Sequence, residues 1–232
     1  MSMPVQDPSA PGAQRRQTRE LGPYDWEPGD TPPLEAFLRN RHSLEPELLR
    51  HMQVSYPDEA RDGMQNGDLL FFCSKGLFAW LIRKLSGGPY SHVGMVWHWH
   101  DRVVIFESAA KGVHILRAQT KVDQYDGLVD WYEVKGLTQE QRRRLFQVAI
   151  DGLGKPYSAW GLLRFAWRRL TGRLPKVSTD RGARTMFCSE YIAWCFERVA
   201  RDLAPELASE FSSPSALARS SALELKGILK AG

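Results

Sequence analysis

The apolar residues of this chain change from helical to strand-like spacing and back again. Between residues 34 and 52 they recur at every third or fourth position, which predicts one or two short helices before the Tyr56-Pro57 break. Residues Asp68 to Cys73 then form a short apolar run that predicts a buried strand. The segment 76–88 is amphipathic and ends in two glycines, which indicates a helix with a glycine stop.

Residues 91 to 134 carry a β pattern, in which β-branched and aromatic residues lie between polar or glycine-containing breaks. The first two segments are separated by the polar run His98 to Asp101, which predicts a hairpin. An antiparallel sheet over residues 67–134 is the simplest arrangement of these segments. The predicted strands of this region are 91–97, 102–108, 112–118 and 127–134.

Helical spacing returns after the predicted sheet. Thr138 and Gln141 have the spacing of a capping box, and an apolar stripe follows them. A further helix is predicted over residues 156–170, and a last one begins near Cys188. Because the strands precede most of the helices, the predicted fold class is α+β, with an antiparallel sheet packed against helices.

The first 33 residues are rich in Pro, Gly, Gln and Arg and lack apolar periodicity, which predicts a disordered or loosely attached tail. We expect residues 34–232 to form a single domain. The chain contains no run of about 18 apolar residues, and its N-terminus has no apolar signal region. These features favour a cytoplasmic protein.

Charge and cysteine content narrow the function only slightly. The 31 Lys and Arg residues against 27 Asp and Glu give a net charge of +4, which is too small to indicate a nucleic-acid partner. The basic residues cluster between Arg164 and Arg184, where a solvated face is favoured over a patch that contacts anions or a membrane surface. None of the three cysteines forms a CxxC pair, so no disulfide framework is indicated.

Cys188 is the cysteine best placed for chemistry. Cys195 falls on the apolar face of the predicted helix 188–200, and Cys73 ends an apolar strand, so both are expected to be structural. Cys188 opens its helix after a basic loop. The positive end of a helix dipole and nearby cations both favour the thiolate form of a cysteine.

A cysteine nucleophile needs a base, and His92 is the strongest candidate among six histidines. It enters an otherwise apolar strand directly after a Gly-Gly-Pro turn, where an imidazole needs a polar partner. The other five histidines are expected at the surface or as ordinary strand residues.

The predicted hairpin supplies a partner for His92. With a four-residue turn at 98–101, Glu107 lies directly across from His92, and with a two-residue turn at 100–101 it is the diagonal neighbour on the same face. The carboxylate could then fix the imidazole in a nucleophile, base and orienter triad. A His–Glu pair that only stabilises the hairpin is the alternative.

Metal and phosphate sites are not indicated by the sequence. His92, His98 and His100 share one parity along their strand, but six strand residues span roughly 20 Å, too far for all three to ligate one ion. The chain contains neither a P-loop nor a dinucleotide-binding glycine motif. We therefore expect no metal and no organic cofactor.

The order His92, Glu107, Cys188 resembles that of the permuted papain-like amidases, the YiiX/YebB-like branch of the NlpC-like superfamily. In this branch a circular permutation puts the histidine strand before the cysteine helix, so the resemblance implies a permuted papain-like α+β fold. The matching segments are short, but their order and spacing together are specific. They span residues 66–217 and read NGDLLFF, SHVGMV, FES followed by GVHIL, GKPYS, FCSEYI and SSPSAL.

The resemblance implies that Cys188 is the nucleophile, His92 the general base and Glu107 the orienting carboxylate. The implied activity is that of an amidase or peptidase acting through a thioester on Cys188. A backbone N–H near the start of the cysteine helix would then help to bind the oxyanion.

Tyr90 and Ser91 precede the base and are candidate substrate-binding residues, although loop packing explains them equally well. Ser158, in GKPYS, stands where many members of the family have aspartate, which leaves any substrate contact there open. The implied substrate is a small peptide or a lipid-linked amide, and peripheral membrane contact and oligomeric state stay open. Two alternatives are an acyltransferase of the same fold, similar to the lecithin:retinol acyltransferase-like proteins, and a non-catalytic binding module.

Overall fold

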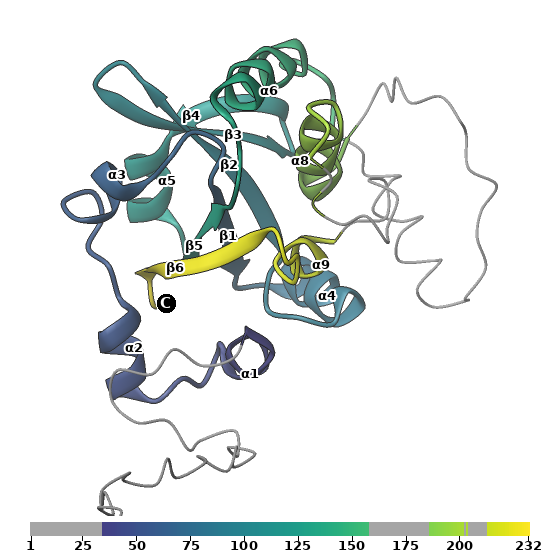
Figure 1. The fold of residues 1–232 in the computed structure, drawn as a ribbon. Coiled ribbons are helices and arrows are strands. Elements are labelled where there is room, and N and C mark those ends of the chain that lie inside the picture. Colours follow the sequence, from purple (N-terminus) through teal and green to yellow (C-terminus); the bar gives the residue numbers. More distant parts are fainter. Residues whose placement is uncertain (1–33, 158–185, 202, 204–212) are drawn as a thin grey trace, which may run out of the picture.

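The computed structural model describes residues 34–157, 186–201, 203 and 213–232 (Figure 1). The predicted tail 1–33, nearly all of the predicted helix 156–170, Ser158 and the basic segment 164–184 lie outside them. The described residues combine helices with an antiparallel sheet, as the α+β prediction requires. None of the helices described is long and apolar enough to cross a membrane.

A six-stranded antiparallel sheet with the strand order β4-β3-β2-β1-β5-β6 forms the centre of the fold (Figure 1). Five of the strands lie where the sequence pattern predicts them. β6 comes from the C-terminal end of the chain, pairs with β5 and was not predicted. The strands are β1 (Leu69–Ser74), β2 (His92–Trp99), β3 (Arg102–Ala109), β4 (Gly112–Arg117), β5 (Gly127–Val134) and β6 (Leu223–Lys230).

Several helices have the start and stop signals that the sequence indicates. Thr138 and Gln141 form the predicted capping box at the start of α6, and Gly87 ends α4 in the left-handed conformation at φ 65°. The short helices α3 and α5 were not predicted. The helices described are α1 (Leu34–Asn40), α2 (Pro46–Met52), α3 (Ala60–Gly63), α4 (Leu77–Ser86), α5 (Ala118–Gln124), α6 (Gln139–Asp151), α8 (Cys188–Glu197) and α9 (Pro214–Leu217).

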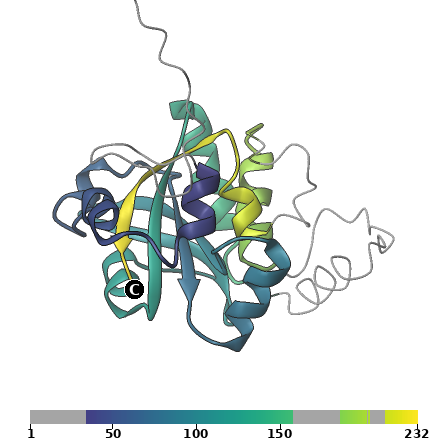
Figure 2. The same cartoon turned by 90° about the horizontal axis from the view of Figure 1, so that it is seen from below.

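Alternate side chains of the sheet pack into two separate cores. Phe71 belongs to the core that includes residues of α1, α6, α8 and α9, whereas Phe72 belongs to the core that includes residues of α3 and α5. α1 and α9 lie side by side (Figure 2), where Arg219 pairs with Glu35 at 2.8 Å. α8 packs across β2 and β3, so the cysteine helix lies against the two strands of the predicted hairpin.

The hairpin of β2 and β3 has the shorter of the two predicted turns. Trp99 pairs with Arg102 and Met95 with Phe106, which leaves His100 and Asp101 as the turn residues. His100 adopts a φ of 55°, the left-handed conformation that a tight hairpin turn needs at its first central position. In this register Glu107 is the diagonal neighbour of His92 on the same face of the sheet.

A buried ion pair joins the N-terminal helices to the sheet. Arg41, directly after α1, donates from Nε and Nη2 to the two carboxylate oxygens of Asp130 on β5 at 2.7 and 2.6 Å. The two side chains are only 1% and 0% exposed. Asp130 also accepts a hydrogen bond of 2.7 Å from the Tyr90 hydroxyl. A bidentate pair of this kind fixes both distance and orientation between distant parts of the chain.

Replacing Arg41 with methionine should lower the free energy of unfolding by about 3–5 kcal/mol, because Asp130 stays buried without its cation. Chemical denaturation followed by circular dichroism measures the change. Arg39→Met is the matched control, since Arg39 is exposed two residues earlier, on α1, and it should change the free energy by less than about 0.5 kcal/mol. Equally small effects of both variants would contradict a stabilising role for the pair.

Candidate active site

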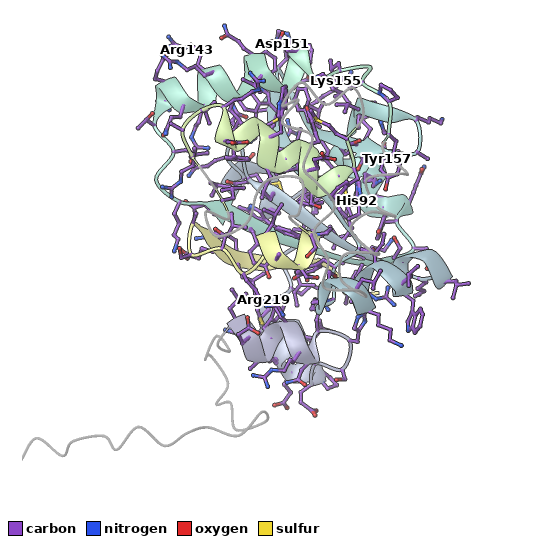
Figure 3. All side chains as sticks on the ribbon, turned by 90° about the vertical axis from the view of Figure 1, so that its right-hand side faces the viewer. His92, Arg143, Asp151, Lys155, Tyr157 and Arg219 are labelled. Carbon is purple, nitrogen blue, oxygen red and sulfur yellow. The ribbon has the colours of Figure 1, made fainter. Side chains whose placement is uncertain are left out.

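A cavity of about 250 Å³ lies where α4, the strands β2 and β3 and the start of α8 meet. Two of the three predicted catalytic residues, Cys188 and His92, line it, and Tyr157 lines it beside them. His92 and Tyr157 lie on the same side of the molecule (Figure 3). Ser91, directly before β2, and Ser108 of β3 also line the cavity, as does Lys121 from α5.

His92 and Glu107 form the predicted pair. The Nε2 atom of His92 lies 2.7 Å from Oε2 of Glu107, and the two side chains are 15% and 2% exposed. Both face the α5 side of the sheet, where the His92 ring packs against Phe72. Because Nε2 is bound to Glu107, Nδ1 is the ring nitrogen left for another partner.

Two further side chains, those of Lys121 and His114, lie close to the other carboxylate oxygen of Glu107, Oε1. Lys121 donates from Nζ to Oε1 at 3.0 Å, and Nε2 of His114 lies 3.3 Å from the same oxygen. His114 stands directly opposite Glu107 in the pairing of β3 with β4. The buried carboxylate is therefore surrounded by groups from β2, β4 and α5, which compensates the cost of burying its charge.

This environment shifts the pKa values of the pair in opposite directions. Burial lowers the pKa of His92, but the charges of Glu107 and Cys188 and hydrogen bonds to both outweigh burial and raise it to about 9. Burial raises the pKa of Glu107, but His92 and Lys121 outweigh it and lower this pKa to about 2. At neutral pH the site therefore holds an imidazolium next to a carboxylate.

Cys188 is the first residue of α8 and is 5% exposed. It lines the same cavity as His92, and its thiol is close enough to the His92 ring to help raise the pKa of that ring. His92 is the first residue of β2, so its ring lies at the end of the sheet, where a helix packed on the opposite face can reach it. The structure thus brings together all three residues that the sequence singled out.

The segment that leads into Cys188 is fixed from two sides at Met186. Ser108, which is fully buried on β3, donates from Oγ to the Met186 carbonyl oxygen at 2.6 Å. The Met186 N–H donates to the carbonyl oxygen of Pro156 at 3.1 Å. Because Ser108 directly follows Glu107 in the strand, the strand that carries the carboxylate also positions the start of the cysteine helix.

The two predicted substrate-binding residues have different positions. Ser91 lines the cavity, and its Oγ accepts a hydrogen bond of 3.1 Å from the Ser74 N–H. Tyr90 does not line the cavity: it is fully buried, and its hydroxyl contacts Asp130 and Tyr132. This placement gives Tyr90 a part in the core around the Arg41–Asp130 pair and offers no support for a substrate contact.

The other two cysteines are buried outside the cavity. Cys195 is fully buried in the core of α8, where burial raises the pKa of its thiol well above the usual value. Cys73 is 3% exposed, and burial raises its pKa even though Arg83 donates to its sulfur at 3.4 Å. Both placements agree with the structural role expected of them.

Sequence reasoning missed two residues of the site, Lys121 and Ser108. Lys121 lies on α5, a seven-residue helix in a region where only strands were predicted. Ser108 lies within the FES segment, but its bond to Met186 spans 78 residues of sequence and leaves no local signal. Among the residues described, no group of three or more His, Cys, Asp or Glu side chains is placed to hold a metal ion.

Residues 63–205, the greater part of the chain, match the profile of the permuted papain-like amidase family, YaeF/YiiX, C92. The chain belongs to this family. Membership confirms the resemblance seen in the order of His92, Glu107 and Cys188, and it implies an amidase or peptidase. The permuted papain-like fold accounts for a histidine on an early strand and a cysteine on a late helix.

The fold of this member of the permuted papain-like amidase family is also that of a solved structure. The metalloprotein YiiX from Escherichia coli O157:H7 superposes with a TM-score of 0.53 at 20% sequence identity. The match covers 69% of this chain and 95% of that one. At this identity the similarity concerns the fold alone. No curated protein sequence is significantly similar to the chain.

Replacing Glu107 with glutamine should lower the pKa of His92 from about 9 by at least about one unit, because the neighbouring negative charge is lost. Nitrogen NMR of the labelled imidazole, recorded across pH, measures the shift. Lys121→Met keeps the carboxylate beside the ring and should leave the His92 pKa raised. Glu133→Gln, which removes only the ion pair with Lys226, is the distant control. An unchanged His92 pKa in Glu107→Gln would contradict the assigned pairing.

Iodoacetamide at mildly acidic pH should label Cys188 at least about tenfold faster than Cys73 or Cys195. Of the three cysteines, only Cys188 lines the cavity, and His92, whose pKa is raised to about 9, lines it as well. Peptide mass spectrometry after short exposures measures the three rates. In His92→Asn the preference should be lost. Equal labelling of all three cysteines in the wild type would count against catalysis.

Proposed function

We propose that the protein is a cysteine-dependent amide hydrolase in which Cys188 is the nucleophile and His92 the base. Glu107 orients His92. The observation that supports this best is an imidazole with a carboxylate 2.7 Å from Nε2 that lines one cavity together with a helix-terminal thiol. Such a set combines the nucleophile, the base and the orienting group of covalent acyl-transfer catalysis.

Before acylation the proton of the Cys188 thiol has moved to His92, which leaves a thiolate beside an imidazolium. The sulfur attacks the carbonyl carbon of the amide, and the π electrons move to the carbonyl oxygen as the C–S bond forms. When the carbonyl re-forms, the C–N bond breaks and the imidazolium gives its proton to the departing nitrogen. An amine leaves, and the acyl group remains on Cys188 as a thioester.

Deacylation uses the same groups on water. His92 is now neutral. It takes a proton from a water molecule while the oxygen of that water attacks the thioester carbonyl carbon. The C–S bond then breaks, a carboxylic acid leaves, and the proton on His92 again faces the sulfur. Glu107 keeps its charge throughout, and its contact with Nε2 keeps Nδ1 directed at the sulfur.

The start of α8 suits the oxyanion that forms in both steps. The Cys188 N–H belongs to the first residue of the helix, where no preceding turn supplies an acceptor for it. This N–H and the helix dipole favour negative charge at that end. At about 250 Å³ the cavity is smaller than the clefts of about 300–1,000 Å³ that enclose whole ligands, so it suits the acyl part of a substrate.

Incubation with p-nitrophenyl acetate tests this function without knowledge of the natural substrate. The wild type should release p-nitrophenolate and gain one acetyl group on Cys188, which intact-protein and peptide mass spectrometry detect. Cys188→Ala should gain none while its thermal midpoint stays near that of the wild type. His92→Gln should slow acetylation by about 10²–10⁴-fold, because the base is lost.

Cys195→Ala is the matched control, since it removes a thiol from the same helix. It should keep acetylation while losing stability, because it leaves a cavity in the core. Acetylation of Cys188→Ala at the wild-type rate, or a large loss of stability in that variant, would contradict the proposal. Acetyl transfer to an added amine in preference to water would make the protein an acyltransferase.

A further inference from the structure

Helix α4 carries apolar side chains on two opposite faces. Ala79 and Ile82 are buried and line the cavity. Leu77, Trp80 and Leu81 point the other way and are 81%, 46% and 43% exposed. Among the described residues, the large apolar side chains that are exposed number four, and only Trp99 lies elsewhere. A contiguous exposed apolar patch of this kind marks an interaction surface.

The exposed side chains form a stripe along the helix. Leu77, Trp80 and Leu81 have the spacing i, i+3, i+4, which puts them on one face of an α-helix. Lys84 continues that stripe at i+7, and its ammonium lies 4.9 Å from the centre of the Trp80 ring. α4 stands at the edge of the molecule next to α9 (Figures 1 and 2), so the stripe can meet a flat surface.

The charge around this stripe is positive. The segment 75–88 contains Lys75, Arg83 and Lys84 and no acidic residue. Arg83 turns inward to Cys73, whereas Lys75 and Lys84 are exposed. The nearby acid is Asp126, which pairs with Lys75 at 3.2 Å on the open surface. Two exposed lysines therefore flank an apolar stripe.

We propose that α4 docks the protein on the surface of an anionic lipid bilayer. Leucine and tryptophan side chains enter the boundary between headgroups and acyl chains, and lysines beside them pair with lipid phosphates. A second copy of the chain fits the stripe less well. Pairing two identical surfaces about a twofold axis would bring Lys75 and Lys84 of both copies close together.

Docking by this face has a consequence for the substrate. The opposite face of α4 lines the cavity that Cys188 enters, so a bilayer bound to α4 lies one helix away from the sulfur. If the proposed hydrolase function holds, on which this consequence rests, the substrate class is an amide whose acyl chain is anchored in lipid. Binding itself needs no catalysis.

Vesicle sedimentation with the full chain tests the docking. Binding should be strong to phosphatidylcholine vesicles that contain phosphatidylglycerol, weak to phosphatidylcholine alone, and reduced by salt. Leu77→Ser/Trp80→Ser/Leu81→Ser should weaken binding at least about tenfold, because most of the inserted apolar area is lost. Trp99→Ser, which changes a tryptophan of similar exposure on the hairpin, 40% against 46% for Trp80, should bind like the wild type.

Charge variants separate the two contributions. Lys75→Glu/Lys84→Glu should weaken binding to the anionic vesicles, whereas Arg143→Glu, exposed on α6, should change it little. All variants retain the segment 164–184, so its contribution is common to them. Cys188→Ala should bind like the wild type, which distinguishes failed docking from failed catalysis.

Two results would overturn the proposal. The first is binding by the triple α4 variant as tight as that of the wild type. The second is a wild-type dimer, measured by sedimentation equilibrium, that does not bind vesicles and that the triple variant dissociates, since a second copy would then cover the stripe.

Discussion

A carboxylate buried in the sheet is the constraint on which the site depends. Glu107 is 2% exposed, and a charge at that depth is stable only with partners close on several sides. Three elements supply these partners: β2 supplies His92, β4 supplies His114 and α5 supplies Lys121. The same contacts raise the pKa of His92 to about 9 and hold its ring in place.

The order of the elements explains how this charged pair meets a thiol. β2 and β3 are neighbours in sequence and are joined by a two-residue turn, so the His92–Glu107 pair is local. Cys188 follows much later and depends on long-range anchors, of which the bond from Ser108 to Met186 is the most direct. In the permuted order the His92–Glu107 pair therefore comes from neighbouring strands, and Cys188 meets it only through the packing of α8 on the hairpin.

Local patterns predicted the parts of the site that local geometry determines. A hairpin turn of either two or four residues puts His92 and Glu107 on the same face of the sheet, so their pairing could be predicted without the exact turn length. Helical spacing in turn separated Cys188 from the buried Cys195. Lys121 could not be found this way, because the short helix α5 has no strong periodic or capping signal and is stabilised by packing on the sheet. For Tyr90 the sequence left a substrate contact and packing equally open, because the core around Asp130 that receives its hydroxyl is assembled from distant segments.

Proximity of Cys188 to His92 is the central claim, and cross-linking with dibromoacetone measures it directly. The reagent alkylates a thiol and then an imidazole nitrogen only if its short carbon chain can span both atoms. Peptide mass spectrometry should find a bridge between Cys188 and His92 in the wild type and none in His92→Asn. Monofunctional labelling of Cys188 alone, or a bridge from Cys188 to another histidine, would contradict the account.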